Sequence, residues 1–315
     1  MKVLVFGAGA IGSAFGGFLS PFHDVTLLGR RPHLEKIREE GLQVSGIWGR
    51  HTFKNLRCEN RFQSLRQADP FFDLVLVTVK SFDTEKAAAQ IAEILGPQTL
   101  VLSLQNGLGN IERLCRMLPP PQVLVGRVIF GVTQDEPGKI RVTVIAEPTA
   151  VGEIRRKKIT PRIRRLARLF SEAGLPTVPC RDIQSLLWVK VIYNSALNPL
   201  ASLLECHYGL LGEKDLTRWA MEEIVHEIYA VAEKTGVHLH PARAEKYLRL
   251  FYSKLLPRTY DHRPSMLQDL EKGRRTEMDS LNGAIVRLGR REGVKTPMNR
   301  WLQRRIQEKE ALVCR

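Results

Sequence analysis

Short runs of consecutive apolar residues, separated by helix-like segments, dominate the first part of the chain. Continuous apolar runs of about four to eight residues are typical of strands buried on both faces of a parallel sheet. The Thr84–Leu95 stretch between two of these runs has helical spacing. The pattern therefore predicts a doubly wound α/β sheet. The runs are Val3–Phe6, Val25–Leu28, Asp73–Val79 and Thr99–Leu104.

Two further β segments and a helix follow these runs. Val123–Val132 and Ile140–Val151 flank a turn at residues 136–139 and are expected to extend the same sheet. A helix is expected to begin at Thr160-Pro161, because proline is favoured in the first helical turn. Its inward-facing residues are expected to be Ile163, Leu166, Ala167 and Phe170.

From Asp182 onward the pattern changes to long helical segments with few strand signals. We expect a domain boundary near residue 180, which divides the chain into domains of residues 1–180 and 181–315. The helical domain is expected to cover the open edge of the sheet and to form a cleft there.

The composition is that of a folded globular protein. Of the 315 residues, 43% are hydrophobic and 26% are charged, which excludes a disordered or collagen-like chain. No apolar run approaches the roughly 20 residues that span a membrane, so no membrane association is expected. The apolar N-terminal stretch could be mistaken for a secretory signal, but the strand that follows it at Val25–Leu28 favours a folded βαβ unit.

Cysteine and histidine positions indicate no metal site. The five cysteines are odd in number, scattered, and without the paired spacing of zinc ligands, which favours a reduced cytoplasmic location. His238 and His240 lie two residues apart with no carboxylate at ligand spacing. We therefore expect solvated loop histidines and no metal.

The chain is strongly basic. Its 48 Lys and Arg against 33 Asp and Glu leave a formal net charge of +15, which suits nucleic acid, an anionic membrane surface, or small anions such as nucleotide phosphates and carboxylates. Much of the excess lies in Arg155–Lys158 and in Arg162, Arg164, Arg165 and Arg168 of the next helix. Because no aromatic residues interleave them, we expect a solvated helix face and no nucleic-acid partner.

A glycine motif lies between the first two strands. Gly7-Ala8-Gly9-Ala10-Ile11-Gly12 has the spacing G-x-G-x-x-G, directly after a buried strand and at the start of a helix. Gly7 would allow the tight turn, Gly9 the approach of backbone amides to a pyrophosphate, and Gly12 close packing of helix on strand. This context favours a dinucleotide-binding Rossmann domain, with all six residues at the cofactor, over a merely tight turn.

The residues after the second strand indicate which dinucleotide binds. NAD sites usually place Asp or Glu there to bind the ribose hydroxyls, whereas this chain has Gly29-Arg30-Arg31. Arginine suits a 2′-phosphate, so NADP(H) is the expected cofactor and Arg30 its phosphate contact. The alternative is that one or both arginines are solvated loop charges, and Arg31 fits either role.

Polar residues directly follow two other strands. Lys80 comes after the third apolar run and Asn106, within Gln105-Asn106-Gly107, after the fourth. Ligands bind at the carboxyl ends of parallel strands, so both side chains are expected to contact cofactor or substrate. The alternatives are an ordinary surface lysine and an Asn-Gly turn.

In the helical domain, polar residues interrupt an otherwise apolar helix over residues 186–200. Lys190, Asn194 and Asn198 are four residues apart and so lie in a line on one face. Burying such groups without partners costs several kcal/mol. They either cap other protein groups or line a pocket whose ligand supplies acceptors, and we favour the pocket.

A second polar cluster lies nearer the C-terminus. Ser265 and Gln268 fit a helix capping box, which is an alternative to a binding role for Ser265. Glu277 directly precedes an expected buried helical stripe. The stripe is Met278, Leu281, Ile285 and Leu288.

Six motifs together suggest a family. They are Gly7–Gly12, Val79-Lys80, Gln105-Asn106-Gly107, Trp188-x-Lys190-x3-Asn194-x3-Asn198-Pro199, Ser265-Met266-x2-Asp269 and Thr276-Glu277-x-Asp279-x2-Asn282-Gly283. On these residues the chain resembles the ketopantoate reductase (2-dehydropantoate 2-reductase) family over nearly its whole length. The main departure is the basic insert at Arg155–Lys158.

The resemblance implies a fold and an activity. The fold would be an N-terminal Rossmann domain, residues 1–180, and a helical substrate domain of the 6-phosphogluconate dehydrogenase C-terminal type, residues 181–315. The activity would be NADPH-dependent reduction of 2-dehydropantoate to (R)-pantoate in pantothenate and coenzyme A biosynthesis.

The resemblance also implies residue roles. Lys190 would be the catalytic acid, and Glu277 a second catalytic residue that engages the substrate hydroxyl or the lysine. Asn194, Asn198 and Ser265 would bind the substrate, Arg30 and Lys80 the cofactor, and Asn106 both. The reaction itself agrees, because hydride addition to a ketone creates an alkoxide that needs a proton donor.

Two other functions stay open. The pocket could accept another branched 2-oxo acid, since each pocket methyl group changes discrimination by only about 1–3 kcal/mol. The chain could instead bind NADP without turnover, as a sensor, although the complete polar set argues against that. The expected partner is a small 2-oxo acid, and the sequence is compatible with a homodimer.

Overall fold

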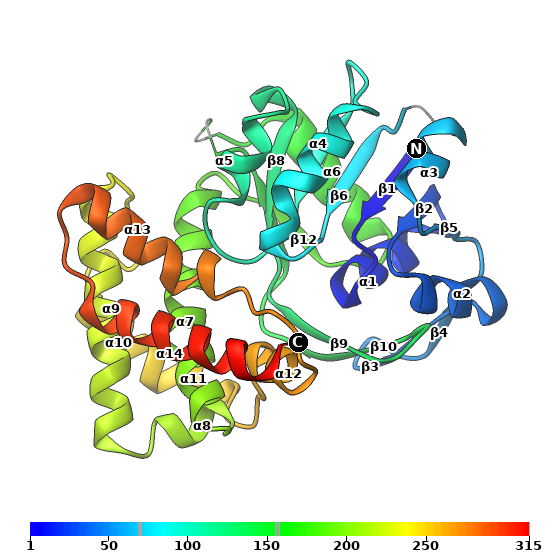
Figure 1. Cartoon of the computed structure of the whole chain (residues 1–315). Helices are drawn as coiled ribbons and strands as arrows, with labels where there is room; N and C mark the ends of the chain where they lie inside the picture. The colour runs from blue at the N-terminus through cyan, green and yellow to red at the C-terminus, as the bar shows by residue number, and fades with distance from the viewer. Residues whose placement is uncertain (69–70, 155, 157, 315) are drawn as a thin grey trace. The chain divides into compact units, whose positions relative to one another are not determined.

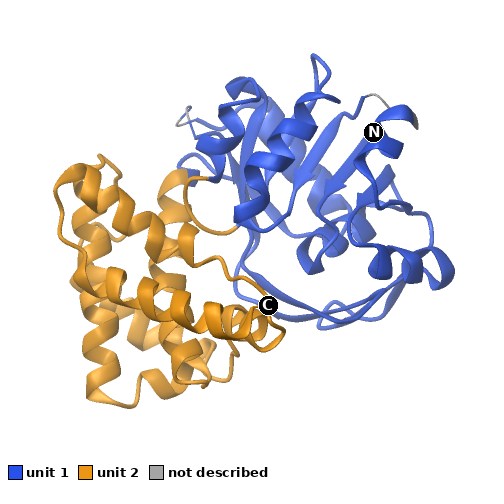
Figure 2. Ribbon diagram, in the orientation of Figure 1, with its two compact units in different colours: residues 1–105, 110–183 blue, residues 106–109, 184–315 orange. Residues whose placement is uncertain are grey.

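The computed structural model describes residues 1–68, 71–154, 156 and 158–314 (Figure 1). Contacts divide the chain into two compact units (Figure 2). Residues 1–105 and 110–183 form the first unit, and residues 106–109 and 184–315 form the second. The short Asn106–Gly109 segment, which directly follows a strand of the first unit, therefore belongs with the helical unit.

The first unit contains an eight-stranded sheet. Neighbouring strands are parallel except for the β8–β11 pair, which is antiparallel. β1 lies between β6 and β2. In sheet order they are β12 (Thr177–Pro179), β11 (Thr149–Gly152), β8 (Val123–Arg127), β7 (Leu100–Ser103), β6 (Leu74–Val77), β1 (Lys2–Phe6), β2 (Asp24–Leu28) and β5 (Arg57–Glu59). The predicted α/β class is confirmed.

Helices cover both faces of this sheet. Residues of α1 (Ala10–Leu19), α2 (Arg31–Glu40) and α6 (Pro161–Glu172) share one core cluster with the strands. Residues of α3 (Phe62–Ala68), α4 (Thr84–Ala92) and α5 (Asn110–Cys115) share the other. Two short 3₁₀ turns, η1 (Ser81–Asp83) and η2 (Pro120–Gln122), complete the helical elements described there. The sheet is thus doubly wound, as predicted.

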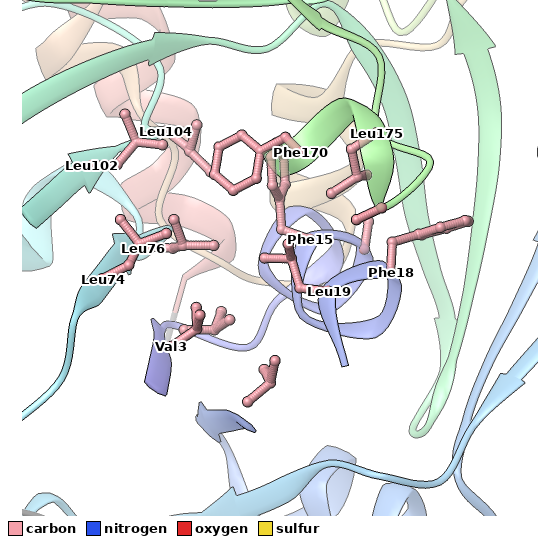
Figure 3. Packing of buried hydrophobic residues seen from close by; sticks show 14 of the residues in the cluster. Val3, Phe15, Phe18, Leu19, Leu74, Leu76, Leu102, Leu104, Phe170 and Leu175 are labelled. Carbon is pink, nitrogen blue, oxygen red and sulfur yellow. The ribbon is translucent and has the colours of Figure 1, made fainter. Parts of the chain in front are cut away.

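The apolar runs and the α6 stripe form the core on the α1 side. Figure 3 shows Leu76 and Leu102 of the strands near Phe15 of α1 and Phe170 of α6. The rings of Phe15 and Phe170 meet edge to face with centroids 5.4 Å apart. All four residues predicted to face inward from α6 are buried, so that prediction is confirmed; they are Ile163, Leu166, Ala167 and Phe170.

One prediction for the sheet is wrong in part. β9 (Phe130–Glu136) and β10 (Lys139–Ile145) do not extend the large sheet but form a second, four-stranded sheet with β3 (Leu42–Gly46) and β4 (His51–Phe53). Only β8 and β11 of the two predicted segments join the large sheet. The hairpin leaves it because β10 pairs with β3, and aromatic packing then buries its inner face.

The second unit is helical around α7 (Ile183–Leu203). The other elements are α8 (Tyr208–Leu211), α9 (Asp215–Lys234), α10 (Ala244–Leu250), the π-helix η3 (Phe251–Leu255), α11 (Leu256–Arg258), α12 (Ser265–Glu271), η4 (Met278–Ser280), α13 (Asn282–Glu292) and α14 (Pro297–Val313). α9, α13 and α14 pack against one another. In the described part of the chain, no helix has both the length and the apolar character needed to cross a bilayer.

The predicted stripe after Glu277 is buried at three of its four positions. Met278, Leu281 and Ile285 are buried, whereas Leu288 is partly exposed. The stripe spans two elements, because the chain makes the 3₁₀ turn η4 before α13 begins.

Candidate active site

The glycine turn has the geometry that each glycine was expected to allow. Gly7 has a φ of +111°, and a Cβ there would lie 2.6 Å from the Val79 nitrogen. A Cβ on Gly12 would lie 2.4 Å from the Gly7 oxygen, so α1 packs too closely on the turn for any side chain. A Cβ on Gly9 would meet no atom within 4 Å. The turn is thus tight at Gly7 and Gly12 and open at Gly9.

The start of α1 offers backbone donors beside this opening. The Ser13 N–H donates to the Gly9 carbonyl at 2.8 Å and so begins the intrahelical ladder. The N–H groups of Ala10, Ile11 and Gly12 precede that ladder and have no intrahelical acceptor. No acidic side chain lies in the first turn. Free amides at a helix N-terminus suit a pyrophosphate, so the residues present fit a dinucleotide.

The two arginines after β2 differ in their surroundings. Arg31 Nε lies 2.6 Å from Glu35 Oε1, on the same helix. Arg30 is exposed and precedes α2 in the N-cap position. Its carbonyl accepts the Leu34 N–H, but the described residues include no hydrogen-bond or ion-pair partner for its side chain. Arg30 is therefore the arginine better able to meet a phosphate.

A buried histidine, which the sequence analysis missed, holds α2 in place. His33 Nε2 lies 2.9 Å from Ser13 Oγ of α1, and its Nδ1 accepts the Gly138 N–H at 2.9 Å. An Nδ1 that accepts a backbone N–H carries no proton, so the ring is neutral with its proton on Nε2. Burial lowers the pKa of His33 accordingly. This ring ties the helix after Arg30 to α1 and to the β9–β10 turn.

The ends of β6 and β7 are joined by a side chain. Gln105 Nε2 donates to the Val79 carbonyl at 3.0 Å and to Thr84 Oγ1 at 2.8 Å. The Gln105 side chain therefore links the loop that contains Lys80 to the end of β7. Lys80 itself is half-buried, in the N-cap position of η1.

In the second unit the structure brings Lys190 and Asn106 together. Lys190 Nζ donates to Asn106 Oδ1 at 2.6 Å, although the two residues are 84 positions apart. Lys190 projects from α7 and Asn106 from the 106–109 turn, and both are half-buried. An asparagine oxygen can orient an ammonium without neutralising it.

The other two polar residues of the α7 line have different surroundings. Asn194 is half-buried, and its side-chain amide has no hydrogen-bond partner among the described residues. Asn198 is buried, and its Oδ1 accepts the Tyr208 hydroxyl at 2.5 Å. Burial raises the pKa of Tyr208 well above its usual value, so the hydroxyl remains a donor. Tyr208, which the sequence analysis missed, thus fixes the orientation of the Asn198 amide. The Asn198 oxygen is occupied by the Tyr208 hydroxyl, and its NH₂ group remains available as a donor.

The 106–109 turn also contacts the segment that carries Glu277. Gly107 has a φ of +82°, and a Cβ there would lie 2.5 Å from the Ser280 oxygen. The Leu108 N–H donates to the Ser280 carbonyl at 2.8 Å. The Glu277 carbonyl in turn accepts the Ser280 hydroxyl at 2.9 Å. Lys190, Asn106 and the turn that begins at Glu277 therefore form one connected group.

Ser265 does not cap a helix. Pro264 occupies the N-cap position of α12, Ser265 is the first helical residue, and no side-chain cap is formed. Gln268 Nε2 instead donates to the Arg263 carbonyl at 3.3 Å. The capping-box alternative is therefore wrong, because proline takes the position that the serine would need. The Ser265 side chain is exposed and makes no hydrogen bond with another described residue.

Part of the basic segment is engaged in ion pairs. Arg162 Nη2 lies 2.8 Å from the buried Glu153 carboxylate, which also accepts the Thr160 hydroxyl at 2.6 Å. The Arg162 guanidinium holds the pKa of Glu153 below its usual value. Residues 155 and 157 of the predicted insert lie outside the described residues. In the parts of the chain that are described, no three His, Cys, Asp or Glu side chains gather as metal ligands would.

A sheet unit built for a dinucleotide, together with a helical unit that holds a lysine on an asparagine, defines a nicotinamide-dependent oxidoreductase. Residues 3–156 match the family described as ketopantoate reductase PanE/ApbA, and residues 182–310 match its C-terminal part. The chain belongs to the ketopantoate reductase family.

Individual relatives agree with this assignment. The chain is 39% identical to a 2-dehydropantoate 2-reductase of Aquifex aeolicus, covering 98% of this chain and 97% of that protein. It is 36% identical to the enzyme of the same name from Halobacterium salinarum, covering 96% of each.

Solved structures are similar over the same span. A PanE/ApbA family ketopantoate reductase from Ralstonia eutropha has a TM-score of 0.87 at 31% identity, covering 99% of each chain. D-mandelate dehydrogenase, with NADH and anilino(oxo)acetate, has a TM-score of 0.87 at 28% identity, covering 99% of each chain.

Proposed function

We propose that the protein catalyses the NADPH-dependent reduction of 2-dehydropantoate to (R)-pantoate, a step of pantothenate biosynthesis. Family membership supports the reaction class. The observation that carries the proposal is the 2.6 Å hydrogen bond from Lys190 Nζ to Asn106 Oδ1, since it presents an oriented ammonium as proton donor.

The cofactor site that we propose lies in the N-terminal domain, residues 1–180. The pyrophosphate would lie at the Gly7–Gly12 turn and the 2′-phosphate at Arg30, with Lys80 and Asn106 nearer the reacting end. When bound, NADPH would supply the hydride. Two observations support this site. The space beside Gly9 is open, and the Arg30 side chain has no partner among the described residues.

The helical domain, residues 181–315, would bind the substrate and move the proton. Asn194, Asn198 and Ser265 would donate hydrogen bonds to the substrate carboxylate or hydroxyl. As the carbonyl carbon gains the hydride, its oxygen gains negative charge, and Lys190 would transfer a proton from Nζ to that oxygen. Glu277 would accept a hydrogen bond from the substrate hydroxyl or from the lysine ammonium.

A second candidate is the reduction of a different 2-oxo acid. The similarity to D-mandelate dehydrogenase favours it, because that protein shares the fold over 99% of each chain. A third candidate is an NADP-binding protein without turnover.

One experiment distinguishes these functions. The purified protein is mixed with NADPH and either 2-dehydropantoate or benzoylformate, the 2-oxo acid that corresponds to mandelate, and the absorbance of the reduced nicotinamide is followed. We expect kcat/KM for 2-dehydropantoate to exceed that for benzoylformate at least about 100-fold. The reverse order would support the second candidate, and NADPH binding without turnover of either acid would support the third.

We also propose a cytoplasmic location and a homodimer. All five cysteines are free, which suits a reducing compartment. The exposed apolar side chains of the second unit, Leu216 and Trp219 among them, offer a surface for a second copy. Sedimentation equilibrium would test the dimer, and a mass that stays at 35.7 kDa across micromolar concentrations would contradict it.

A further inference from the structure

A proline interrupts the hydrogen-bond ladder of α7. Pro199 lies inside this helix and has no N–H to donate, so the carbonyl of Ser195, one turn earlier, cannot receive its usual intrahelical bond. Ser195 is fully buried, at 0% exposure, so water does not replace that donor readily. The carbonyl therefore needs a donor from another element.

Asn282 supplies this donor. It is the first residue of α13 and is also 0% exposed. Its Nδ2 donates to the Ser195 carbonyl at 3.1 Å and to Asn299 Oδ1 at 3.0 Å. Both hydrogens of one amide group are thus used, which fixes the orientation of the side chain.

Glu227 determines the orientation of Asn299. Asn299 lies in α14 and donates from Nδ2 to Glu227 Oε2 at 2.7 Å. Glu227, in α9, also accepts the backbone N–H groups of Met298 and Asn299 at 2.7 and 3.0 Å. Burial raises the pKa of Glu227, but each of its two carboxyl oxygens faces a backbone N–H donor and therefore acts as an acceptor. Asn299 thus turns its nitrogen to Glu227 and its oxygen to Asn282. Asn282 must then donate to Ser195.

The hydrogen-bond network of Glu227, Asn299 and Asn282 ends at Ser195, which lies between the proposed site residues Asn194 and Asn198. Ser195 directly follows Asn194 and lies three positions before Asn198. Asn282 lies two positions after Ser280, the last residue of the η4 segment that follows Glu277. The Ser280 carbonyl accepts a hydrogen bond from the Leu108 N–H of the 106–109 turn. The hydrogen bond from Asn282 to Ser195 therefore joins the two segments that carry the proposed site.

We propose that Asn282 is a positioning residue for the reduction: by replacing the hydrogen bond that Pro199 removes, it holds the Asn194–Asn198 turn of α7 in register with the Glu277 segment. This inference rests on the proposed function. Asn299 and Glu227 act behind it by fixing its orientation.

A double-mutant cycle tests the proposal. Asn282→Ala leaves the Ser195 carbonyl unpaired while Pro199 is present, whereas on the Pro199→Ala background the new N–H at position 199 can donate to it. We expect Asn282→Ala to lower kcat at saturating 2-dehydropantoate by about 10- to 100-fold and to change the Kd of NADPH by less than about twofold. On the Pro199→Ala background we expect Asn282→Ala to lower kcat by less than about fivefold.

A matched control separates positioning from simple destabilisation. Tyr229→Phe removes a partly buried hydrogen bond from the same unit, the one from the Tyr229 hydroxyl to the Pro241 carbonyl at 2.8 Å. This bond involves neither α7 nor η4. We expect it to lower Tm without changing kcat. The proposal is overturned if folded Asn282→Ala keeps kcat within twofold of the parent. It is also overturned if Asn282→Ala lowers kcat by the same factor with and without Pro199→Ala.

A second readout does not depend on turnover. In protein labelled with ¹⁵N-lysine, the Lys190 Nζ resonance, assigned by its absence from Lys190→Arg, should shift in Asn282→Ala and return toward its original position in Asn282→Ala with Pro199→Ala. An unchanged resonance in Asn282→Ala would overturn the positioning role. If the parent protein reduces no 2-oxo acid, the proposed function fails, and this resonance alone decides the positioning role.

Discussion

The Lys190 ammonium lies within hydrogen-bond distance of an oxygen that cannot take its proton. Asn106 is a neutral acceptor, so the contact orients Nζ and leaves its positive charge in place. A carboxylate in the same position would have formed an ion pair and reduced the acidity of the ammonium. The amide at residue 106 therefore orients the ammonium without itself adding a negative charge.

Two substitutions separate the proton from the charge at Lys190. We expect Lys190→Ala to lower kcat by about 10²- to 10⁴-fold. Lys190→Arg retains a cation but is a far weaker acid, so it should recover only a small part of that loss. Steady-state kinetics with 2-dehydropantoate, beside NADPH titration, would measure both. Near-parental turnover in Lys190→Arg would show that charge alone suffices.

Tyr208 and Tyr247 form a natural pair of test and control. Both rings are buried, but Tyr208 donates to Asn198, whereas the Tyr247 hydroxyl has no hydrogen-bond partner in the described structure. Tyr208→Phe should leave the Asn198 amide free to turn its oxygen toward the substrate carboxylate. We expect KM for 2-dehydropantoate to rise about tenfold, equivalent to about 1.4 kcal/mol. Tyr247→Phe should leave KM unchanged, and equal effects of the two would argue against a role in orienting Asn198.

Arg30 and Arg31 form a second such pair. Arg31 is paired with Glu35 on its own helix, and Arg30 is exposed at the N-cap position. Arg30→Ala should weaken NADPH binding about tenfold and leave NADH binding nearly unchanged, since only NADPH carries the 2′-phosphate. Arg31→Ala should change neither by more than about twofold. Calorimetric titration of each cofactor gives the four affinities, and a larger effect of Arg31→Ala would reassign the phosphate contact.

At the level of elements, the strands and helices with a regular hydrophobic pattern were predictable, and the short strands of mixed polarity were not. β1, β2, β6, β7 and α6 all appear where uninterrupted apolar runs or a helical stripe predict them. β3, β4 and β5 were missed, because three- to five-residue strands with mixed polarity give no clear periodicity. The β9–β10 hairpin was recognised, but sequence pattern does not say with which strand a hairpin pairs.

His33 makes the position of α2 sensitive to pH. Its lowered pKa means that the unfolded chain binds this proton more readily than the folded chain. The contribution of His33 to stability is therefore complete above its ordinary pKa of 6.5 and decreases as the pH falls below that value. The partly buried His262 and His23 also have pKa values lowered by burial, and they add to the same trend.

His33→Asn isolates the share of His33. The asparagine oxygen can accept the Gly138 N–H but does not ionise. We expect the variant to lose about 1 kcal/mol at pH 8, for the lost bond to Ser13, and to lose less stability than the parent between pH 6.5 and 5.5. Urea unfolding at these three pH values is the measurement. If the free energy of unfolding changes with pH equally in parent and variant, His33 does not contribute to the pH dependence of stability.

At the level of the whole molecule, motif reasoning identified the family but could not assemble the site. The spacing of Lys190, Asn194 and Asn198 marks one helix face, and the position of Asn106 after a strand marks a ligand edge. Asn282 belongs to one of the family motifs, but no spacing in the sequence indicates that it contacts Ser195 or that Tyr208 contacts Asn198, because both contacts are made only by folding. Sequence periodicity reports which face of an element is buried, and it does not report which buried polar groups meet.

The assignment of Asn106–Gly109 to the second unit has a consequence for any attempt to dissect the protein. The chain passes from the first unit into the second after Gln105, returns after Gly109, and passes over again after Ile183. A fragment that begins at Gln184 would thus lack four residues of its own unit. In such a fragment Lys190 would have no Asn106 oxygen, and the Ser280 carbonyl would have no Leu108 N–H. The helical unit is compact in space but discontinuous along the sequence, so truncation at the apparent linker would remove part of the proposed active site together with the sheet.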